Sequence, residues 1–435
     1  MWAFIIFGTK KFILGYNKLI LNSFLRVDSY MAKFESFSSL NIIPSLKDGL
    51  SELGLTKPSP IQSKAIPHLL EGRDLLGIAK TGSGKTAAFC LPILDKIIKS
   101  PIETSPLHIR ALILTPTREL ASQIEQFIQD LGEVDGVSSL VVFGGARRAN
   151  QVESLKEGID ILVATPGRLL DLIESNCLSL DEVETFVLDE ADMMLNMGFL
   201  QDVKAITSYL PVRKQVSLFS ATMPKTIERL AKEVLVDPIK VQVDIESTVV
   251  KKIEQRLYTL VKKNKLKLLL HLLEDEALSK VLLFSKTKIG ADILVEELQE
   301  NGISCNSFHS NKSQTQREMA LDSFRTGEIR LLVATDVAAR GIDILDITHV
   351  INYALPEEVS NYVHRIGRTG RAGSDGVAIT FCVSSEGRLL SSIEAKIGEK
   401  IPVVEDHPFF AELNSKDPHS KKKKPNPKSK KKKKK

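Results

Sequence analysis

The stretch Ala79-Lys80-Thr81-Gly82-Ser83-Gly84-Lys85-Thr86 decides how the rest of the chain is read. It follows the apolar run 74–78 and precedes the apolar residues 87–91, so we expect a strand, a glycine loop and a helix. Gly82 and Gly84 let successive backbone N–H groups turn inward, and the helix start adds positive potential there. The pattern predicts a phosphate-binding loop, in which Lys85 reaches the β- and γ-phosphates and the Thr86 hydroxyl ligates Mg²⁺. A glycine-rich turn without a ligand is the alternative.

Two acidic residues follow another apolar run. Asp189-Glu190-Ala191-Asp192 comes directly after Phe186-Val187-Leu188, which we expect to be a strand. A carboxylate at the carboxyl end of a strand beside a phosphate loop can hold a metal ion and activate water. We therefore predict that Asp189 holds Mg²⁺ through water and that Glu190 orients or deprotonates the attacking water. Taken alone, the four residues could also be an acidic helix start.

Strand-like and helix-like segments alternate along most of the chain. In the first half, apolar strand-like runs cover 111–115, 140–143, 161–164, 185–188 and 217–220, with helical patterns such as 119–131 and 168–173 between them. In the second half, a helical pattern at 263–276 precedes strand-like runs at 281–285, 304–309, 329–334, 349–353 and 377–383. This alternation is typical of parallel sheets with helices on both faces. We predict two α/β domains, of which only the first has a phosphate loop.

Charge is distributed unevenly along the 435 residues, whose net charge is +5. Residues 421–435, with eleven lysines and no acid, contribute +11, and residues 1–30 contribute +3, which leaves −9 for residues 31–420. The tail cannot bury a core, so we predict that it is disordered. The four scattered cysteines lack metal-ligand spacing and indicate a reducing compartment, so we expect a cytoplasmic protein.

Residues 1–30 do not continue the alternation. The apolar run 2–7 is followed by Lys10 and Lys11, and no stretch approaches the roughly twenty apolar residues of a membrane helix. A signal peptide would place its basic residues before the apolar run instead. An organellar presequence is one alternative. We favour a start at Met31, with residues 1–30 as translated upstream sequence or a poorly ordered extension, and we expect no membrane association.

Further motifs stand in order between Phe37 and about Val383, and together they resemble those of the DEAD-box ATP-dependent RNA helicases. In chain order they are Phe37 with Gly54–Gln62 (the Q motif), Ala79–Thr86, Pro116–Leu120, Gly144-Gly145, Thr165–Arg168, Asp189–Asp192, Ser220–Thr222, Gln314 with Arg317, Ala334–Asp343 and His364–Arg371. The resemblance implies two tandem RecA-like domains, ATP and Mg²⁺ as cofactors, and RNA as the partner. It also implies RNA-stimulated ATP hydrolysis coupled to local unwinding of RNA duplexes or remodelling of RNA–protein complexes.

The same resemblance implies the site residues. ATP would be bound by Phe37, Gln62, Ala79, Lys80, Thr81, Gly82, Ser83, Gly84, Lys85, Thr86 and Asp343. Hydrolysis would use Lys85, Asp189, Glu190 and the arginine-finger residues Arg368 and Arg371, with Thr86 and Asp189 at Mg²⁺. RNA would be contacted by Pro116, Thr117, Arg118, Gly145, Thr165, Arg168, Gln314, Arg317 and Thr335, and Ser220, Thr222 and His364 would couple hydrolysis to strand separation.

A few residues depart from the family pattern. Ala79 replaces the glycine of the general phosphate loop, which is common in this family. In the Q motif, Leu55 replaces the usual aromatic residue and Ser59 the usual threonine, so adenine stacking is expected to be weaker. The segments 284–287 and 309–312 also differ from common family wording, without loss of an essential group.

The domain boundaries follow from these motifs and from the alternation. We place an N-terminal extension at 1–33, the first helicase domain at 34–243, a linker at 244–252, the second helicase domain at 253–405 and a disordered lysine-rich tail at 406–435.

Two other functions fit a two-domain plan of this kind. A DNA-translocating helicase would show DNA-stimulated rather than RNA-stimulated ATP hydrolysis. A non-enzymatic RNA clamp would be expected to lack Glu190 or the arginine finger, and both are present. The RNA-side motifs offer glycines, hydroxyls and single arginines, which contact phosphates without reading bases. We expect a monomer, and ribosomal precursor particles and RNA decay complexes are both compatible with it as partners.

Overall fold

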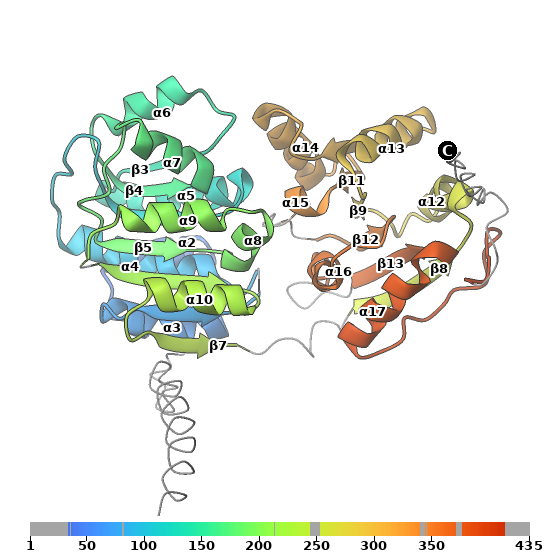
Figure 1. Cartoon of the computed structure of the whole chain (residues 1–435), viewed down its shortest axis with the longest axis horizontal. Helices are drawn as coiled ribbons and strands as arrows, with labels where there is room; N and C mark the ends of the chain where they lie inside the picture. Colours follow the sequence, from blue (N-terminus) through green and yellow to red (C-terminus); the bar gives the residue numbers. More distant parts are fainter. Residues whose placement is uncertain are drawn as a thin grey trace, which may run out of the picture. The chain divides into compact units, whose positions relative to one another are not determined.

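The computed structural model describes residues 34, 36–80, 82–212, 214–243, 253–339, 344, 346–370 and 376–413. These residues form two compact units that divide near residue 247 (Figure 1). Each unit is built around one parallel sheet. Three predicted segments lie outside the described residues: the N-terminal extension 1–33, the linker 244–252 and the lysine run 421–435.

The first unit contains a seven-stranded sheet in the order β3-β4-β2-β5-β6-β1-β7. Its strands are β1 (Leu75–Ile78), β2 (Ile109–Leu114), β3 (Ser139–Val142), β4 (Ile159–Ala164), β5 (Thr185–Leu188), β6 (Gln215–Ser220) and β7 (Ile239–Gln242). Its α-helices are α2 (Pro44–Glu52), α3 (Pro60–Leu70), α4 (Lys85–Lys99), α5 (Arg118–Gly132), α6 (Arg148–Leu155), α7 (Pro166–Glu174), α8 (Ala191–Asn196), α9 (Leu200–Ser208) and α10 (Lys225–Val234). Short 3₁₀ turns are η1 (Phe37–Ser39) and η2 (Glu133–Asp135).

Helices cover both faces of this sheet. Successive side chains of a strand point to opposite faces, so each strand contributes to two apolar clusters. In β2, Ala111 and Ile113 pack with helices α2 to α5, whereas Leu112 and Leu114 pack with helices α7 to α10. All six residues of β2 are buried. This is the burial expected for a central strand of a parallel sheet with two covered faces.

The second unit contains a six-stranded sheet in the order β10-β11-β9-β12-β13-β8. Its strands are β8 (Ile253–Thr259), β9 (Val281–Phe284), β10 (Cys305–Phe308), β11 (Leu331–Ala334), β12 (His349–Asn352) and β13 (Gly376–Cys382). Its helices are η3 (Lys262–Asn264), α12 (Lys265–Leu273), α13 (Lys288–Glu300), α14 (Gln314–Thr326), α15 (Asp336–Ala339), α16 (Val359–Ile366), η4 (Ser384–Glu386) and α17 (Gly387–Ile397). No helix in the described ranges has the length and apolar character needed to cross a membrane.

The predicted pair of parallel α/β folds is confirmed, and the strands lie within two residues of the predicted runs. Two strands were missed, β7 and β8, on either side of the predicted linker. Both strands lie at sheet edges. Their sequences, I-K-V-Q and I-E-Q-R-L-Y-T, mix polar with apolar residues, because an edge strand needs fewer apolar residues than a central strand.

The second unit continues beyond residue 405, where we predicted that the disordered tail begins. Val404 N–H donates to Leu257 O at 2.8 Å, and Ala411 N–H donates to Thr259 O at 3.1 Å. Phe409 packs against the apolar cluster on this side of the sheet. The prediction of a tail that starts at residue 406 is therefore wrong, because the second unit continues at least to Ala411. The sequence of this segment lacks a helical or strand periodicity. Backbone hydrogen bonds to the edge strand β8, which need no such pattern, hold it in place.

A buried carboxylate ties three segments of the first unit together. Asp74, just before β1, accepts hydrogen bonds from Val216 N–H at 2.8 Å and from Val236 N–H at 2.7 Å, one on each carboxylate oxygen. Burial raises the pKa of Asp74, and these two N–H donors act in the opposite direction. The side chain thus joins the start of β1 to β6 and to the segment after α10.

We predict that Asp74→Asn lowers the free energy of unfolding of the first unit by about 1–3 kcal/mol, because the new amide group leaves one buried N–H without an acceptor. Urea unfolding followed by circular dichroism measures this change. The exposed Asp181→Asn is the matched control and should unfold as the wild type does. Equal unfolding midpoints for the two variants would contradict the prediction.

Candidate functional site

The phosphate loop connects the end of β1 to the start of α4. Ala79 N–H donates to Ser220 O at 3.0 Å, and Ser83 N–H donates to Lys80 O at 3.3 Å. Gly82 and Gly84 have φ values of 78° and 90°, a region that strains residues with a side chain. The fifteen-residue α4 begins directly after the loop and adds its N-terminal dipole. The loop therefore has the strand, turn and helix of an anion-binding site, with Thr81 outside the described residues.

Lys85 lies buried beside this loop and contacts both acidic residues. Its Nζ donates to Glu190 Oε1 at 2.7 Å and to Ala79 O at 3.2 Å, and it lies 4.0 Å from Asp189 Oδ1. Burial alone would lower the pKa of Lys85, but the charges of Glu190 and Asp189 outweigh it and raise the pKa. Lys85 is therefore charged, and it lies between the phosphate loop and the acidic pair.

Asp189 and Glu190 occupy the turn between β5 and α8. Asp189 N–H donates to Leu114 O at 2.9 Å, which fixes the turn to the neighbouring strand β2. Burial raises the pKa of Asp189 to about 7. Glu190 has φ 53° and ψ 49°, a left-handed conformation that costs a non-glycine residue about 1–2 kcal/mol. Such strain is typical of functional sites, where the surrounding structure holds the residue in place.

Oxygen atoms suited to magnesium lie at this turn and at the helix start. Asp189 Oδ1 is buried and accepts no hydrogen bond from the described part of the chain. The Lys85 ammonium, 4.0 Å away, is too distant to donate a hydrogen bond to this oxygen, so the oxygen remains available as a ligand for a metal ion. Thr86, half-buried in the first turn of α4, adds a hydroxyl oxygen. Mg²⁺ prefers oxygen ligands, so these residues fit the predicted magnesium site.

The Q-motif residues pack against the phosphate loop. Gln62 Nε2 donates to Gly84 O at 3.0 Å, and Gln62 Oε1 accepts from Ser59 N–H at 2.7 Å. Both ends of the amide are engaged within the protein, so contact with adenine requires Gln62 to exchange a partner. Phe37 is only 4% exposed and lies in the core cluster beneath helices α2 to α5. The adenine-binding roles of Gln62 and Phe37 stay predictions.

Ser220 and Thr222 are connected to the acidic motif through Asp192. The backbone N–H and the hydroxyl of Thr222 both donate to Asp192 Oδ2, at 2.9 and 2.6 Å. Ser220 Oγ donates to Thr222 O at 2.7 Å and accepts from Asp192 N–H at 3.3 Å. Sequence reasoning gave Asp192 no role of its own. Its place in the same short motif as Asp189 and Glu190 was the available signal.

The predicted RNA contacts of the first unit gather at one edge of its sheet. These residues follow three neighbouring strands: Pro116 and Thr117 come after β2, Gly145 after β3 and Thr165 after β4. Arg118 lies over the ring of Phe143, 6.0 Å from its centroid. A Cβ atom at Gly145 would come within 2.4 Å of Arg118 Nη1, so only glycine lets this arginine lie there.

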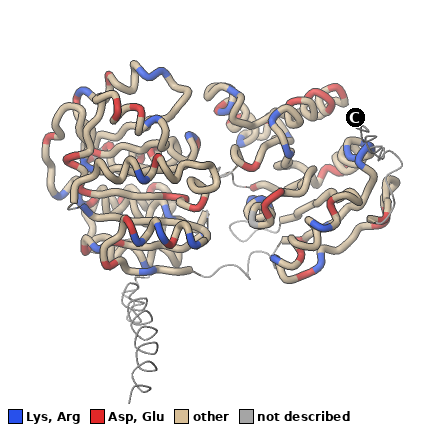
Figure 2. Tube along the Cα trace, in the orientation of Figure 1, with Lys and Arg blue, Asp and Glu red and all other residues tan. Residues whose placement is uncertain are grey.

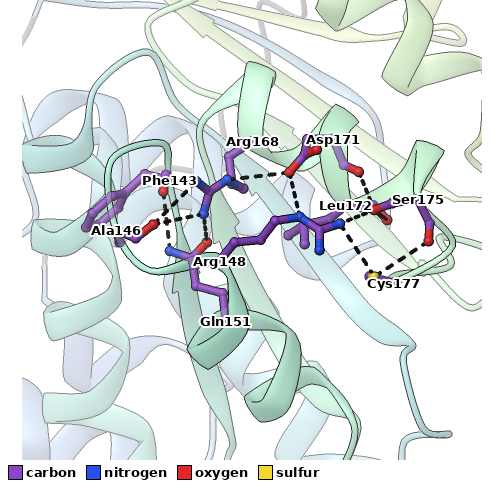
Figure 3. Close-up of polar contacts among 9 residues, drawn as sticks. All are labelled: Phe143, Ala146, Arg148, Gln151, Arg168, Asp171, Leu172, Ser175 and Cys177. Carbon is purple, nitrogen blue, oxygen red and sulfur yellow. Dashed lines mark hydrogen bonds and ion pairs between the residues drawn. The ribbon is translucent and has the colours of Figure 1, made fainter.

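Arg168 is held by residues of the same unit (Figure 3). Its guanidinium donates to Gln151 Oε1 and lies 3.4 and 3.5 Å from Ala146 O. Asp171 Oδ2 lies 3.7 Å from Arg168 Nε and accepts from Arg148 Nε at 3.0 Å. The Arg168 side chain is only 12% exposed. It therefore fixes the loop after β3, and its predicted contact with RNA requires some of these bonds to be exchanged.

In the second unit, Arg365 connects two of the predicted motifs. Its Nη2 donates to Asp336 Oδ2 at 2.8 Å, and its Nη1 donates to Ala354 O at 2.6 Å. Arg365 is 3% exposed and also stacks on the Phe284 ring, 4.9 Å from the centroid. Sequence reasoning assigned roles to His364 and Arg368 but missed Arg365, although it lies in the same motif.

The other predicted residues of the second unit lie near the ends of its elements. Gln314 opens α14, and Arg317 stacks on Phe308 with its guanidinium 4.8 Å from the ring centroid. Thr335 directly follows β11, and its N–H donates to Phe308 O at 3.4 Å. Arg368 Nε donates to His364 O at 3.3 Å at the end of α16. Asp343 and Arg371 lie outside the described residues.

Two tandem parallel α/β units, with a phosphate loop, a buried lysine and an acidic pair in the first, define a two-domain nucleotide-binding protein. The family model for DEAD/DEAH box helicases matches residues 59–230, and the model for the helicase conserved C-terminal domain matches residues 264–373. The chain belongs to the DEAD/DEAH box helicase family.

Curated relatives and a solved structure resemble most of the chain. The DEAD-box ATP-dependent RNA helicase CshA of Bacillus cereus is 40% identical over 366 residues, which cover 84% of this chain and 69% of the relative. The RNA helicase CrhR of Synechocystis is 43% identical over 369 residues, 85% of this chain and 74% of the relative. The structure of Saccharomyces cerevisiae Dbp5 bound to RNA and ADP BeF3 matches with a TM-score of 0.77 at 31% identity, over 85% of this chain and 96% of that one.

We predict that Gly84→Ala weakens ATP binding at least about tenfold, equivalent to about 1.4 kcal/mol. A Cβ atom there would lie 2.5 Å from Gln62 Nε2 and 2.9 Å from Ser59 Oγ, so the loop or Gln62 must move. Titration with a fluorescent ATP analogue measures the change. Gly72→Ala, with φ +76° but no atom within 4 Å of the new Cβ, is the control for backbone strain alone. Equal affinities for the two variants would contradict the prediction.

Proposed function

We infer that the chain is an ATP-dependent RNA helicase, which couples RNA-stimulated ATP hydrolysis to local, largely sequence-independent unwinding of RNA duplexes or remodelling of RNA–protein complexes. The observation that carries this function is the buried Lys85–Glu190 pair, at 2.7 Å, between the phosphate loop and Asp189. The likeness to Dbp5 bound to RNA and ADP BeF3 supports the same pair of ligands here. RNA-stimulated rather than DNA-stimulated release of phosphate from ATP is the primary test.

Lys85 is proposed to exchange its acidic partner for phosphate when ATP binds. The β- and γ-phosphates are strong acceptors, and they would lie at the start of α4, where the glycine loop and the helix dipole favour an anion. Glu190, released from Lys85 Nζ, could then accept a hydrogen bond from the attacking water and orient it. Mg²⁺ bound by Thr86 and, through water, by Asp189 would neutralise phosphate charge. The exchange explains why a charged lysine and a carboxylate are stored together in a buried site.

Asp192 is proposed to transmit the state of the acidic motif to the end of β6. Thr222 donates two hydrogen bonds to one oxygen of Asp192, and Ser220 bonds both segments. A displacement of the Asp189–Asp192 turn must therefore displace the Ser220–Thr222 segment or break these bonds. This network supports the proposed role of Ser220 and Thr222 in coupling.

Partners and location are proposed from simpler properties. The predicted RNA contacts of the first unit lie on hydroxyl, glycine and arginine residues at strand ends, which suits contacts to the RNA backbone. We propose a monomer that acts on ribosomal precursor particles or RNA decay complexes. All four cysteines are free and three are buried, as suits a cytoplasmic protein whose thiols stay reduced.

Hydrolysis is proposed to require Arg368 and Arg371 of the second unit as well as the first unit. We predict that Arg371→Ala binds ATP normally and hydrolyses it roughly 10³–10⁵ times more slowly, the range known for arginine fingers in phosphoryl transfer. Single-turnover hydrolysis at saturating RNA measures this rate. Arg388→Ala, an exposed arginine on α17, is the control and should keep full activity. Near-normal turnover by Arg371→Ala would remove it from the catalytic set.

The lysine tail is proposed to add RNA affinity without a part in catalysis. Each phosphate contact on single-stranded RNA adds about −0.7 to the slope of log binding constant against log salt concentration. Contacts by half of the eleven lysines would therefore steepen this slope by about three to four. We predict that deletion of residues 421–435 raises the RNA concentration for half-maximal ATP hydrolysis, most at low salt, and leaves the maximal rate unchanged. A deletion variant with an unchanged RNA requirement from low to moderate salt would disprove the tether.

A further inference from the structure

Strand β10 lies at the edge of the second sheet and pairs only with β11 among the described strands. The backbone direction of its residues alternates, since N–H and C=O groups of successive residues point to opposite sides of a strand. Ser304 O accepts from Arg330 N–H on the β11 side, and Phe308 O accepts from Thr335 N–H on that side. The intervening Cys305 and Ser307 therefore direct their backbone groups away from the sheet.

Helices α13 and α14 stand on opposite faces of this edge strand. Ser307 Oγ donates to Asp292 Oδ1 of α13 at 2.6 Å, so odd-numbered residues of β10 face α13. Phe308 stacks with Arg317 of α14, so even-numbered residues face α14. The two helices thus form the walls of a groove whose floor is the outer edge of β10.

The groove has a volume of about 530 Å³ and two chemically different walls. The α13 wall offers Asp292, Glu296 and Gln299, and acidic residues line this helix (Figure 2). The α14 wall offers Met319, which is 64% exposed, between Gln316 and Ala320, and Lys312 lines the groove before this helix begins. Exposed methionine on a groove wall is typical of adaptable peptide-binding surfaces.

A polar cluster around Asp292 lines part of the groove. Asp292 accepts hydrogen bonds from Ser307, His309 Nε2 at 2.9 Å and Lys312 Nζ at 2.9 Å. Burial would raise the pKa of Asp292, but these hydrogen bonds outweigh it and lower the pKa to about 2. Asp292 is thus committed to the protein, which leaves Glu296 as the acidic group able to meet a ligand. Gln299 Nε2 bonds Cys305 O at 2.9 Å and occupies one outward acceptor of the edge.

We propose that this groove binds an extended segment of a partner protein, which joins β10 as an additional strand and alternates basic with apolar side chains. Backbone hydrogen bonds to Cys305 and Ser307 would supply affinity, with the bound segment displacing the Gln299 side chain. Side chains of an added strand point alternately toward the two faces of the sheet. A basic residue would meet Glu296 on the α13 side, and an apolar residue would meet Met319 on the α14 side.

The chemistry of the groove argues against the chain's own C-terminal tail as its occupant. Residues 414–435 contain no Leu, Ile, Val, Met, Phe, Tyr or Trp side chain to place on Met319. Pro418, Pro425 and Pro427 also lack the N–H group that a sheet ladder needs. The tail therefore matches the charge of the α13 wall but not the alternation that two different walls require.

The test measures binding of synthetic hexapeptides with blocked ends to the full chain by fluorescence anisotropy. The alternating arginine-leucine peptide is expected to bind saturably. The same peptide with alternate backbone nitrogens methylated should lose binding, because it cannot pair with β10. A glutamate-leucine peptide should also fail, because its charge opposes Glu296. Equal binding of the methylated peptide would overturn strand addition and indicate adhesion to the acidic surface.

Groove variants locate the site. Glu296→Lys and Met319→Lys, both at exposed positions, should each weaken peptide binding about tenfold. The first replaces attraction to the basic peptide by repulsion, and the second places a charge where the peptide's apolar side chain would lie. Glu276→Lys, exposed on the same unit outside the groove, should bind as the wild type does. All three should retain RNA-stimulated ATP hydrolysis. Unchanged binding by both groove variants would overturn the proposal. Binding that appears only after removal of residues 1–30 or 414–435, or a concentration-dependent dimer that excludes the peptide, would also overturn it, because the chain itself would then be the occupant.

Discussion

The buried ion pair between Lys85 and Glu190 is the interaction on which the rest of the site depends. Burial alone would lower the pKa of Lys85, which is 5% exposed, but the neighbouring carboxylates outweigh burial and raise it. The pair lies where the phosphate loop, the end of β5 and the end of β6 meet. The lysine affects its two acidic neighbours differently: it donates to Glu190, whereas burial raises the pKa of Asp189, 4.0 Å away, to about 7. A ligand with phosphate charge is therefore the natural competitor for Lys85.

Around this pair, hydrogen bonds from single side chains connect the sequence motifs of the first unit. Asp192 receives both donors of Thr222, Gln62 spans Ser59 and Gly84, and Arg168 holds the loop after β3 through Ala146. Each of these side chains is satisfied within the protein. Any ligand that binds these side chains must therefore exchange one set of hydrogen bonds for another. An exchange of hydrogen bonds changes the free energy little, whereas a buried group left unpaired is costly. Ligand binding can therefore be linked to a change in the contacts within the protein.

The second unit uses the same parallel fold for a different task. Its strand-end residues are organised by Arg365, which bonds Asp336 after β11 and the backbone after β12. At the edge of its sheet, the outer backbone groups of the short strand β10 face a groove that has Glu296 on the α13 side and Met319 on the α14 side. The phosphate loop and its buried lysine lie on the first unit, and the groove lies on the second.

Sequence patterns alone determined the parallel α/β fold, the phosphate loop, the acidic pair and the family. These features rest on local order, in which apolar runs make buried strands and Gly82, Gly84 and Lys85 stand at fixed positions after one of them. Only the tertiary structure decided the rest. Edge strands β7 and β8 and the packed segment up to Leu413 lack a strong apolar pattern, because partners distant in sequence stabilise them. The roles of Asp192, Gln151 and Arg365 depend on hydrogen bonds to such distant partners, and the groove beside β10 exists because strand order places that strand at an edge. Periodicity reports what a residue does within its own element, whereas its tertiary partners become known only when the sheet is assembled.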